Sequence, residues 1–397
     1  MTRRDRLMAT LRGEPVDRPA VSFYEITGFE DQSDADPYNV HSDPSWRPLI
    51  ELAREATDRI VMRGVGYASG QPDPVALVAE RQSYERNGSR FTVLRVHAGD
   101  RILTERRRRD KDVDTVWTEE HLLKSADDLR AYLAVLASGG RGSQSRGRSG
   151  PGVDVGTGDK APGGTVATNE FLAIEETVGD SGIVMIDTSD PLCRAASLFC
   201  MADYTVIALT EQSLFRELLD RFAEELLAKT EAVATALPGR LWRIFGPEYA
   251  SPPYLPPHLF REYVCRYVTP MVRAIQRHGG FARIHSHGNL KAILDDIAGM
   301  GADGLDPIEP PPQGDVELRY VRERYGKDMV LFGNLEASDI ENLPTPQFAE
   351  RVRRALDEGT AGDGRGFVLM PSSCPYGRRL SPLALRNYET MIEIALA

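Results

Sequence analysis

Short apolar runs of strand length recur along the chain, and turn-forming residues bound each of them. Helical patterns, with apolar residues three and four positions apart, lie between most of these runs. Such alternation is typical of repeated strand and helix units around a parallel sheet. We predict eight strands, at residues 19–25, 58–64, 182–188, 240–246, 281–287, 303–309, 328–334 and 366–372.

The helical patterns are clearest between the last five strands. They close on glycine, as the C-terminus of a helix prefers, and they read HLFREYVCRYVTPMVRAIQRHG, NLKAILDDIAGMG, DVELRYVRERYG and PQFAERVRRALDEG. No glycine-rich dinucleotide fingerprint follows the first strand, which argues against an open doubly wound sheet. We therefore expect one α/β domain over residues 1–397, folded as a TIM (β/α)8 barrel.

Two stretches interrupt this rhythm. Residues 90–118 alternate in a way that predicts antiparallel strands inserted after the second barrel strand, where they would form a cap over one face of the barrel. Residues 138–165 are rich in Gly, Ser and Arg and have hardly any large apolar side chain, so they cannot offset the entropy of ordering. We expect a disordered loop there, exposed to solvent at the surface.

Composition narrows the class of protein. The hydrophobic fraction of 41% can fill a sizeable core, and the net charge of -11 argues against a nucleic acid partner. No stretch approaches the roughly 20 apolar residues that cross a bilayer, and the start lacks the apolar core of a signal peptide. The four cysteines lie far apart without a CxxC pair, so no disulfide framework is expected. We expect a cytoplasmic protein without a membrane partner.

The active site of a TIM barrel is built at the C-terminal ends of its strands. The residues where the apolar runs stop are mostly polar, and if the strands are right these side chains converge on one pocket. They are Glu25, Asp187, Ser189, Glu248, His285, His287, Glu309, Asn334, Glu336 and Cys374.

Two histidines in this set have the spacing of a metal half-site. On a strand, residues i and i+2 point to the same side, so His285 and His287 can face one ion. Cys374 could supply a third protein ligand as a thiolate, and Glu248 is the candidate fourth ligand. A His/His/Cys set favours zinc by ligand softness and geometry.

Each of these residues also has a purely structural interpretation. The histidines could be a polar rim pair, Cys374 a small buried residue, and Glu248 an acidic group near a helix N-terminus. Loop hydrogen bonds to the backbone are the alternative for Glu309, Asn334 and Glu336. Ser189 suits the N-cap of the helix that follows. The remaining cysteines fall within helical patterns and are expected in the core; they are Cys193, Cys200 and Cys265.

The C-terminal half resembles the uroporphyrinogen decarboxylase superfamily, whose fold is a TIM barrel. The opening RDRLMATLRGEPVDRPAV is also similar to that superfamily. The resemblance covers nearly all of residues 240–397, through HSHGNLKAILDDIAGMGADGLDPIEPP, GDVELRYVRERYGKDMVLFGNLEASDI and GFVLMPSSCPYGRRLSPLALRNYETMIE.

The superfamily contains two chemistries. The decarboxylases carry an arginine-rich segment, similar to RQAGRYLPEY, that binds substrate carboxylates after the first strand. Here that position reads FYEITGFEDQ, where acids would repel a polycarboxylate. The other branch consists of methyltransferases that work with corrinoid proteins and carry zinc on an H-x-C pair and a later Cys. His285 and Cys374 match the first and last of these ligands, and His287 replaces the middle cysteine.

The resemblance implies a zinc-dependent methyltransferase that moves a methyl group between a small methylated substrate or thiol and a corrinoid protein. One of Glu309, Asp187 and Glu336 would handle a proton, and Glu25 and Asn334 would contact the substrate. The corrinoid would belong to the partner protein, since this chain has no DxHxxG motif. The methyl donor, the acceptor and the assembly into a homo-oligomer stay open.

Two other functions stay open beside this one. A barrel that has lost the chemistry could bind a ligand without reacting. A metal-independent decarboxylase or lyase could act on a different acid from uroporphyrinogen.

Overall fold

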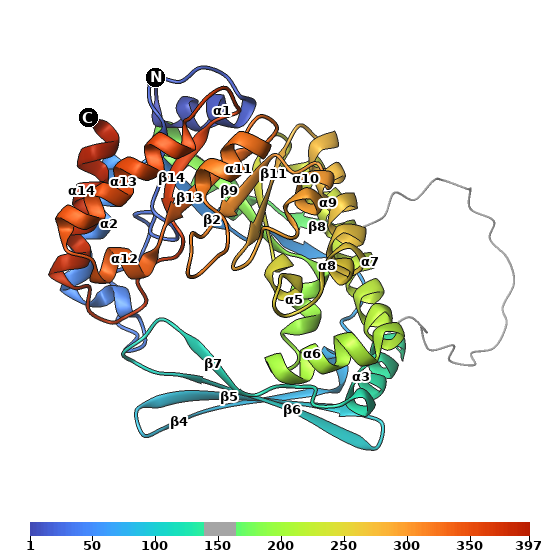
Figure 1. The fold of residues 1–397 in the computed structure, drawn as a ribbon. Helices are drawn as coiled ribbons and strands as arrows, with labels where there is room; N and C mark the ends of the chain where they lie inside the picture. Colours follow the sequence, from blue (N-terminus) through green and yellow to red (C-terminus); the bar gives the residue numbers. More distant parts are fainter. Residues whose placement is uncertain (139–163) are drawn as a thin grey trace, which may run out of the picture.

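The computed structural model describes residues 1–138 and 164–397. The predicted disordered loop at 138–165 lies almost wholly outside the described residues. The rest of the chain forms a barrel with a separate antiparallel sheet below it in Figure 1.

Eight parallel strands form the barrel sheet, in the order β1-β14-β13-β12-β11-β10-β9-β2. The predicted TIM barrel is confirmed, and all eight predicted strands are present. They are β1 (Ala20–Val21), β2 (Arg59–Arg63), β9 (Gly182–Ser189), β10 (Leu241–Phe245), β11 (Phe281–Ser286), β12 (Gly304–Pro307), β13 (Val330–Leu335) and β14 (Phe367–Pro371).

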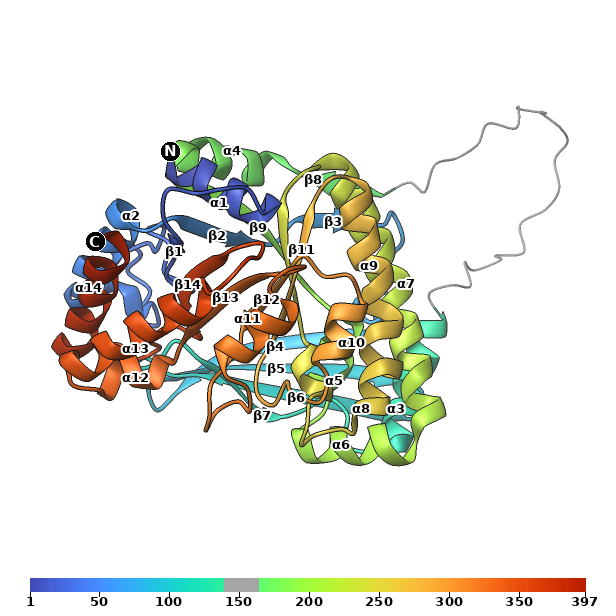
Figure 2. The same cartoon turned by 45° about the horizontal axis from the view of Figure 1, so that its top comes forward.

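Helices surround the barrel, with α13 and α14 on one side and α7 and α9 on the other (Figure 2). Their apolar faces pack on the outward residues of the strands, which forms the main core. The helices are α1 (Arg3–Arg12), α2 (Arg47–Ala56), α4 (Asn169–Val178), α5 (Pro191–Ala196), α6 (Met201–Thr210), α7 (Gln212–Ala236), α8 (Pro257–Phe260), α9 (Arg266–Arg277), α10 (Leu294–Gly299), α11 (Leu318–Tyr325), α12 (Ala337–Asn342), α13 (Thr345–Gly359) and α14 (Pro382–Leu396).

The barrel interior is apolar at its N-terminal end and polar at its C-terminal end. Leu7 and Leu11 of α1 pack against inward residues such as Met185 and Phe332. Burying each leucine stabilises the fold by about 2 kcal/mol. Further along the strands, the inward positions carry charged and polar side chains, so the site lies at the C-terminal mouth.

The barrel closes between β1 and β2 through a side chain. No ladder joins these two strands in the described sheet. Instead, the Asp58 carboxylate accepts a hydrogen bond from Val21 N at 2.9 Å, and Asp58 N donates to Val21 O at 2.7 Å. Asp58 is fully buried and forms ion pairs with Arg6 at 2.6 Å and Arg18 at 2.8 Å.

The antiparallel sheet is the predicted insertion after the second barrel strand. Its strands are β4 (Ala79–Arg86), β5 (Ser89–Ala98), β6 (Arg101–Arg109) and β7 (Val116–Glu120), in that order. We call this sheet the cap; α3 (Ala126–Ser138) follows it. A second small sheet pairs β3 (Gly66–Ala68) with β8 (Thr165–Ala167).

The cap contacts the loop that follows β14. Val113 and Gly377 form an antiparallel bridge, and Asp114 N donates to Tyr376 O at 2.6 Å. The predicted inserted strands are therefore confirmed, and they lie on the side of the C-terminal mouth. None of the described helices combines the length and apolarity needed to cross a membrane.

Candidate functional site

Three buried ionisable side chains on β11 and β12 form the floor of the site. Arg283 and His285 point to the same side of β11, and His285 lies beside Asp306 in the register of the two strands. His285 Nδ1 is 2.7 Å from Asp306 Oδ2, and Arg283 Nε is 2.9 Å from Asp306 Oδ1.

Asp306 stays ionised in this arrangement. Complete burial would raise the pKa of its carboxyl, but the charges of Arg283 and Arg243 and the hydrogen bond from His285 together outweigh burial and hold the pKa below its usual range. The ionised carboxylate accepts the Nδ1 proton of His285. His285 Nε2, the other ring nitrogen, lies 3.4 Å from the hydroxyl of Tyr24.

His287 and Glu309 form the second carboxylate and histidine pair. His287 Nδ1 lies 2.8 Å from Glu309 Oε1, and Glu309 Oε2 accepts a hydrogen bond from Gly288 N at 2.7 Å. Burial alone would lower the pKa of His287, but the bond to Glu309 and the surrounding carboxylate charges together outweigh burial and raise the pKa. In Glu309, burial is likewise outweighed by the bond to His287, the histidine charges and the hydrogen bond from Gly288 N, which together lower the pKa of its carboxyl. The pair is therefore an ion pair near neutral pH.

Glu336 is the site carboxyl whose protonation is poised near neutrality. It precedes α12 and is 7% exposed. Burial, together with the negative charge of Glu309, raises the pKa of Glu336 to about 7, although a hydrogen bond from Ser372 Oγ opposes the shift. Its Oε1 atom has no hydrogen-bond partner among the described residues. Such a carboxyl can take up or release a proton.

Arg243 organises the opposite side of the mouth. Its guanidinium forms two bonds to Asp187, at 2.6 Å and 3.1 Å, and also donates to the Tyr24 hydroxyl. Arg243 Nη1 lies 3.8 Å from Glu25 Oε1. Asp187, a predicted proton carrier, is therefore held in an ion pair with Arg243.

Cys374 lies against Glu25. Its Sγ is 3.3 Å from Glu25 Oε2. Burial and the Glu25 carboxylate both raise the pKa of the thiol. Cys374 is therefore a thiol in this arrangement, and a positive charge would be needed to make it a thiolate.

The described residues do not hold the predicted metal ligands as a group. Within residues 1–138 and 164–397, no three His, Cys, Asp or Glu side chains gather in a geometry that could bind a metal ion. His285 and His287 have the expected proximity, with ring centroids 4.7 Å apart, and each places a carboxylate on Nδ1, as metal-bound histidines commonly do. The third donor is lacking, because Cys374 contacts Glu25 instead. Zinc stays a prediction, and no step below depends on it.

The structure assigns local positions to two other predicted residues. Glu248, the predicted fourth ligand, accepts a hydrogen bond from Gly246 N at 3.0 Å, within the turn after β10. The predicted N-cap at Ser189 is wrong, because Asp190 caps α5 by accepting from Cys193 N at 2.6 Å. Ser189 is the last residue of β9.

The cysteines expected in the core are only partly buried. Cys200 does not lie within a helix, because it is the N-cap of α6 and its sulfur accepts from Asp203 N at 3.4 Å. Cys193 lies in α5, and Cys265 lies in a π-helical turn between α8 and α9. The expected helical position is therefore confirmed for Cys193 and Cys265 and wrong for Cys200, and Cys265 packs against the main core while partly buried.

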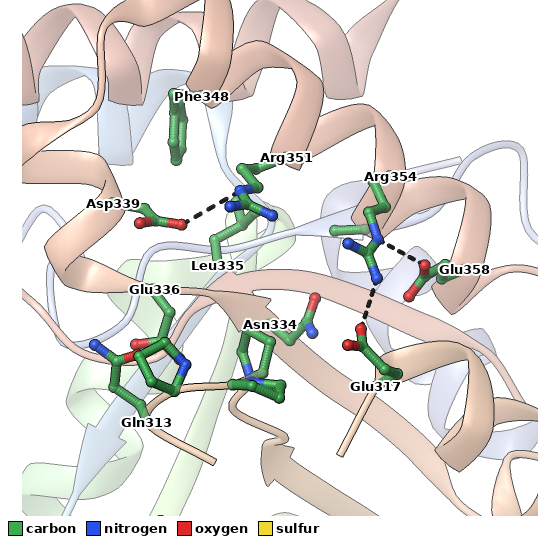
Figure 3. Close-up of a pocket in the computed structure, with 14 residues that line it drawn as sticks. Gln313, Glu317, Asn334, Leu335, Glu336, Asp339, Phe348, Arg351, Arg354 and Glu358 are labelled. Carbon is green, nitrogen blue, oxygen red and sulfur yellow. Dashed lines mark hydrogen bonds and ion pairs between the residues drawn. The ribbon is translucent and has the colours of Figure 1, made fainter. Parts of the chain in front are cut away.

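Asn334 and Glu336 border a cavity beside the mouth, of about 200 Å3 (Figure 3). The wall across from them comes from α13, where Arg351 and Arg354 pair with carboxylates. Glu336 thus adjoins both this cavity and the His287 and Glu309 pair. Asn334, the predicted substrate contact, lies on the cavity side.

Sequence reasoning missed four side chains of the site: Tyr24, Arg243, Arg283 and Asp306. The two arginines stand two residues after inward apolar positions, Leu241 on β10 and Phe281 on β11. A charged residue at an inward position of an apolar strand is rare unless it is paired. An arginine at an inward position of an otherwise apolar strand was therefore the sequence signal that could have identified Arg243 and Arg283.

The fold and the polar strand ends define a TIM-barrel protein with a site at its C-terminal mouth. Residues 191–376 match the family model described as Uroporphyrinogen decarboxylase (URO-D). The predicted resemblance to the uroporphyrinogen decarboxylase superfamily is confirmed by this match. No curated protein matches the chain.

Among solved structures, the chain is similar to a methyltransferase from Methanosarcina mazei. The likeness covers 100% of both chains, with a TM-score of 0.57 and 17% sequence identity. At this identity the likeness shows a shared fold.

Proposed function

We propose that this protein is a methyltransferase that moves a methyl group between a small methylated substrate or thiol and a corrinoid protein. The whole-length likeness to a methyltransferase supports this class. The observation that carries the proposal is the position and pKa of Glu336. This residue lies beside the ion pair of His287 and Glu309, and its pKa is about 7.

Methyl transfer to a thiol requires a group that takes a proton. The bond between the methyl carbon and its donor breaks, a lone pair of the acceptor forms the new bond, and the proton of the acceptor leaves. Glu336 takes that proton near neutral pH and returns it when transfer runs in reverse. Glu309 is a poorer proton carrier, because its ion pair with His287 keeps it ionised.

The substrate would lie beside two accessible groups of the mouth, Glu25 and His287. The side chains of Glu25 and His287 are 43% and 36% exposed, whereas His285 and Asp306 are buried. Asp306, paired with Arg283, then holds the His285 ring in place at the floor of the site. Position and proton transfer are the contributions of this chain.

Methylcobalamin serves as the probe for the methyl carrier. The purified protein is mixed with methylcobalamin and a panel of small thiols, and the absorbance of the cobalt and the mass of the methylated thiol are followed. We expect protein-dependent transfer, slowed about 100-fold in Glu336→Gln because the proton acceptor is lost. Glu350→Gln, at an exposed position of α13, is the matched control. Equal rates in both variants would refute the role of Glu336, and no transfer to any thiol or from any methylated donor would refute the proposal.

Elemental analysis of the purified protein tests the predicted zinc separately. About one zinc per chain, lost in His285→Ala and Cys374→Ala but kept in Cys265→Ala, would mean that the ligands come together when metal binds. A protein that stays free of metal when offered zinc would exclude zinc as its cofactor.

One observation favours a second function, a decarboxylase that uses no metal. The fully buried Arg283 has an Nη1 atom without a hydrogen-bond partner among the described residues, and Arg243 lies nearby at the mouth. These cations could hold the carboxylate of an acid. Release of CO2 from small acids, resistant to a chelator and lost in Arg243→Met, would support this function over methyl transfer.

A further inference from the structure

The first strand of the cap, β4, is a free edge. The sheet order β4-β5-β6-β7 pairs it on one side only. From Glu80 to Arg86 every residue is exposed, and Tyr84 is 39% exposed. A long exposed edge strand is a template for pairing with another strand.

The hairpin fixes which backbone groups of β4 face outward. Asn87 and Gly88 form a two-residue turn with positive φ at both positions, so Arg86 and Ser89 are the closing hydrogen-bonded pair. Alternation along the strand then turns the N–H and C=O groups of three residues away from β5. These are Arg81, Ser83 and Glu85.

The charges of β4 are complementary to a second copy of the same strand. When the strand meets itself in antiparallel orientation with Ser83 opposite Ser83, Arg81 faces Glu85 and Glu80 faces Arg86. Each of these contacts occurs twice by symmetry, so four pairs of opposite charge form. Neither Arg81 nor Arg86 has an ion-pair partner within the described part of the chain.

We propose that two copies of this protein pair through β4, across a twofold axis at Ser83, to form one continuous eight-stranded sheet from the two caps. The three outward residues lie opposite one another in this register, so the pairing forms about six backbone hydrogen bonds. The occupant of the edge is thus a second copy of the chain.

Other arrangements fit less well. Moving the register by two residues in either direction keeps the backbone pattern but separates the charge pairs. The opposite edge of the cap, β7, reads VWTEE, and its antiparallel self-pairing brings no opposite charges together. The backbone pattern permits a few registers, and the charged side chains select one edge and one register among them.

Sedimentation velocity over a range of concentrations tests the dimer. Arg81→Glu sets a carboxylate opposite the Glu85 carboxylate of the second copy, and we expect the dissociation constant to rise about tenfold or more. Adding Glu85→Arg to that variant exchanges the charges and restores dimerisation. Such rescue is not expected of a merely structural change.

Ser83→Pro tests the backbone pairing. Proline removes an N–H that faces outward, so the monomer keeps its own ladder while the dimer loses two central bonds. Ser83→Thr keeps the N–H and is the matched control. A wild-type protein that stays monomeric at high concentration, or a dimer that both Arg81→Glu and Ser83→Pro leave unchanged, would overturn the proposal. If the proline variant misfolds, the Arg81→Glu variant and its rescue by Glu85→Arg still test whether the dimer forms through β4.

Discussion

At the mouth of the barrel, neighbouring charges keep two buried carboxyls ionised. Arg283, His285 and Arg243 lower the pKa of Asp306, and His287 is the main partner that lowers the pKa of Glu309. Glu336 has no cation of its own, and the ionised Glu309 repels its charge. The raised pKa of Glu336 is thus a consequence of how its neighbours are paired.

Because the pKa of Glu336 is raised, the effect of Glu336→Gln on the free energy of unfolding should depend on pH. The pKa of Glu336 rises from 4.5 to about 7 on folding, so the native state binds more protons than the unfolded chain between these values. Wild-type stability therefore falls as pH rises through that window, whereas a glutamine is indifferent to pH. We expect the two proteins to be equally stable at pH 4 and the variant to gain about 3 kcal/mol by pH 8.

Urea denaturation across that pH range measures the difference, with Glu350→Gln as the exposed control. A difference between wild type and Glu336→Gln that does not change with pH would contradict the raised pKa.

Among the residues of the site, the sequence predicted the polar side chains that stand at the ends of apolar runs. His285, His287, Glu309 and Glu336 were found in this way, and the structure brings them together at the mouth. Arg283 was missed because it lies within an apolar run, where a charge depends on a partner from another strand. The contact of Cys374 with Glu25 joins residues from opposite ends of the chain, and no local pattern predicts it.

The secondary structure elements follow the apolar pattern closely. All eight barrel strands were predicted, because strands buried on both faces read as continuous apolar runs. The first cap strand, AERQSYER, was missed because both of its faces are polar and solvated. The start of α5 was misplaced by one residue, since Ser189 and Asp190 are both good N-caps and only the strand register chooses between them.

Asp190 is the N-cap residue of α5, and we expect two substitutions there to differ in their effect on stability. This carboxyl is completely buried, its Oδ1 bonds to Cys193 N, and its Oδ2 has no partner among the described atoms. Burial raises its pKa well above the usual range, so the group is neutral. We expect Asp190→Asn to keep the cap and change stability by less than about 1 kcal/mol, whereas Asp190→Ala loses about 2 kcal/mol.

Equilibrium denaturation in urea at pH 7 compares the two variants. Equal losses in both would mean that the capping bond contributes little, and a large loss in Asp190→Asn would mean that the carboxyl is charged.

Across the whole molecule, the cap and the barrel are linked through the loop after β14. Arg378 donates from Nη1 to the carbonyl oxygens of Pro37 and Lys111, both at 2.9 Å, and Trp46 donates to the carbonyl of Arg378 at 3.1 Å. One side chain thus joins three segments that are distant in sequence. The alternation of strands and helices predicted the barrel, but these links are tertiary and leave no periodic signal.

Arg378→Ala should loosen the cap while the barrel stays folded. The loss of these hydrogen bonds is expected to cost about 1–2 kcal/mol and to speed proteolysis within residues 79–120. Limited proteolysis with mass analysis of the fragments measures the effect. Arg379→Ala, at the exposed neighbouring position, is the control, and cleavage at the same rate in both variants would contradict the link.

The closure of the barrel at Asp58 has a consequence for shortened versions of the chain. Loss of the first 21 residues would remove β1 together with Arg6 and Arg18, and Asp58 would keep a buried charge without partners. The remaining seven strands would form an open sheet whose unpaired margins, β14 and β2, invite aggregation. The N-terminal segment is therefore indispensable to solubility, although it contributes few groups to the chemistry.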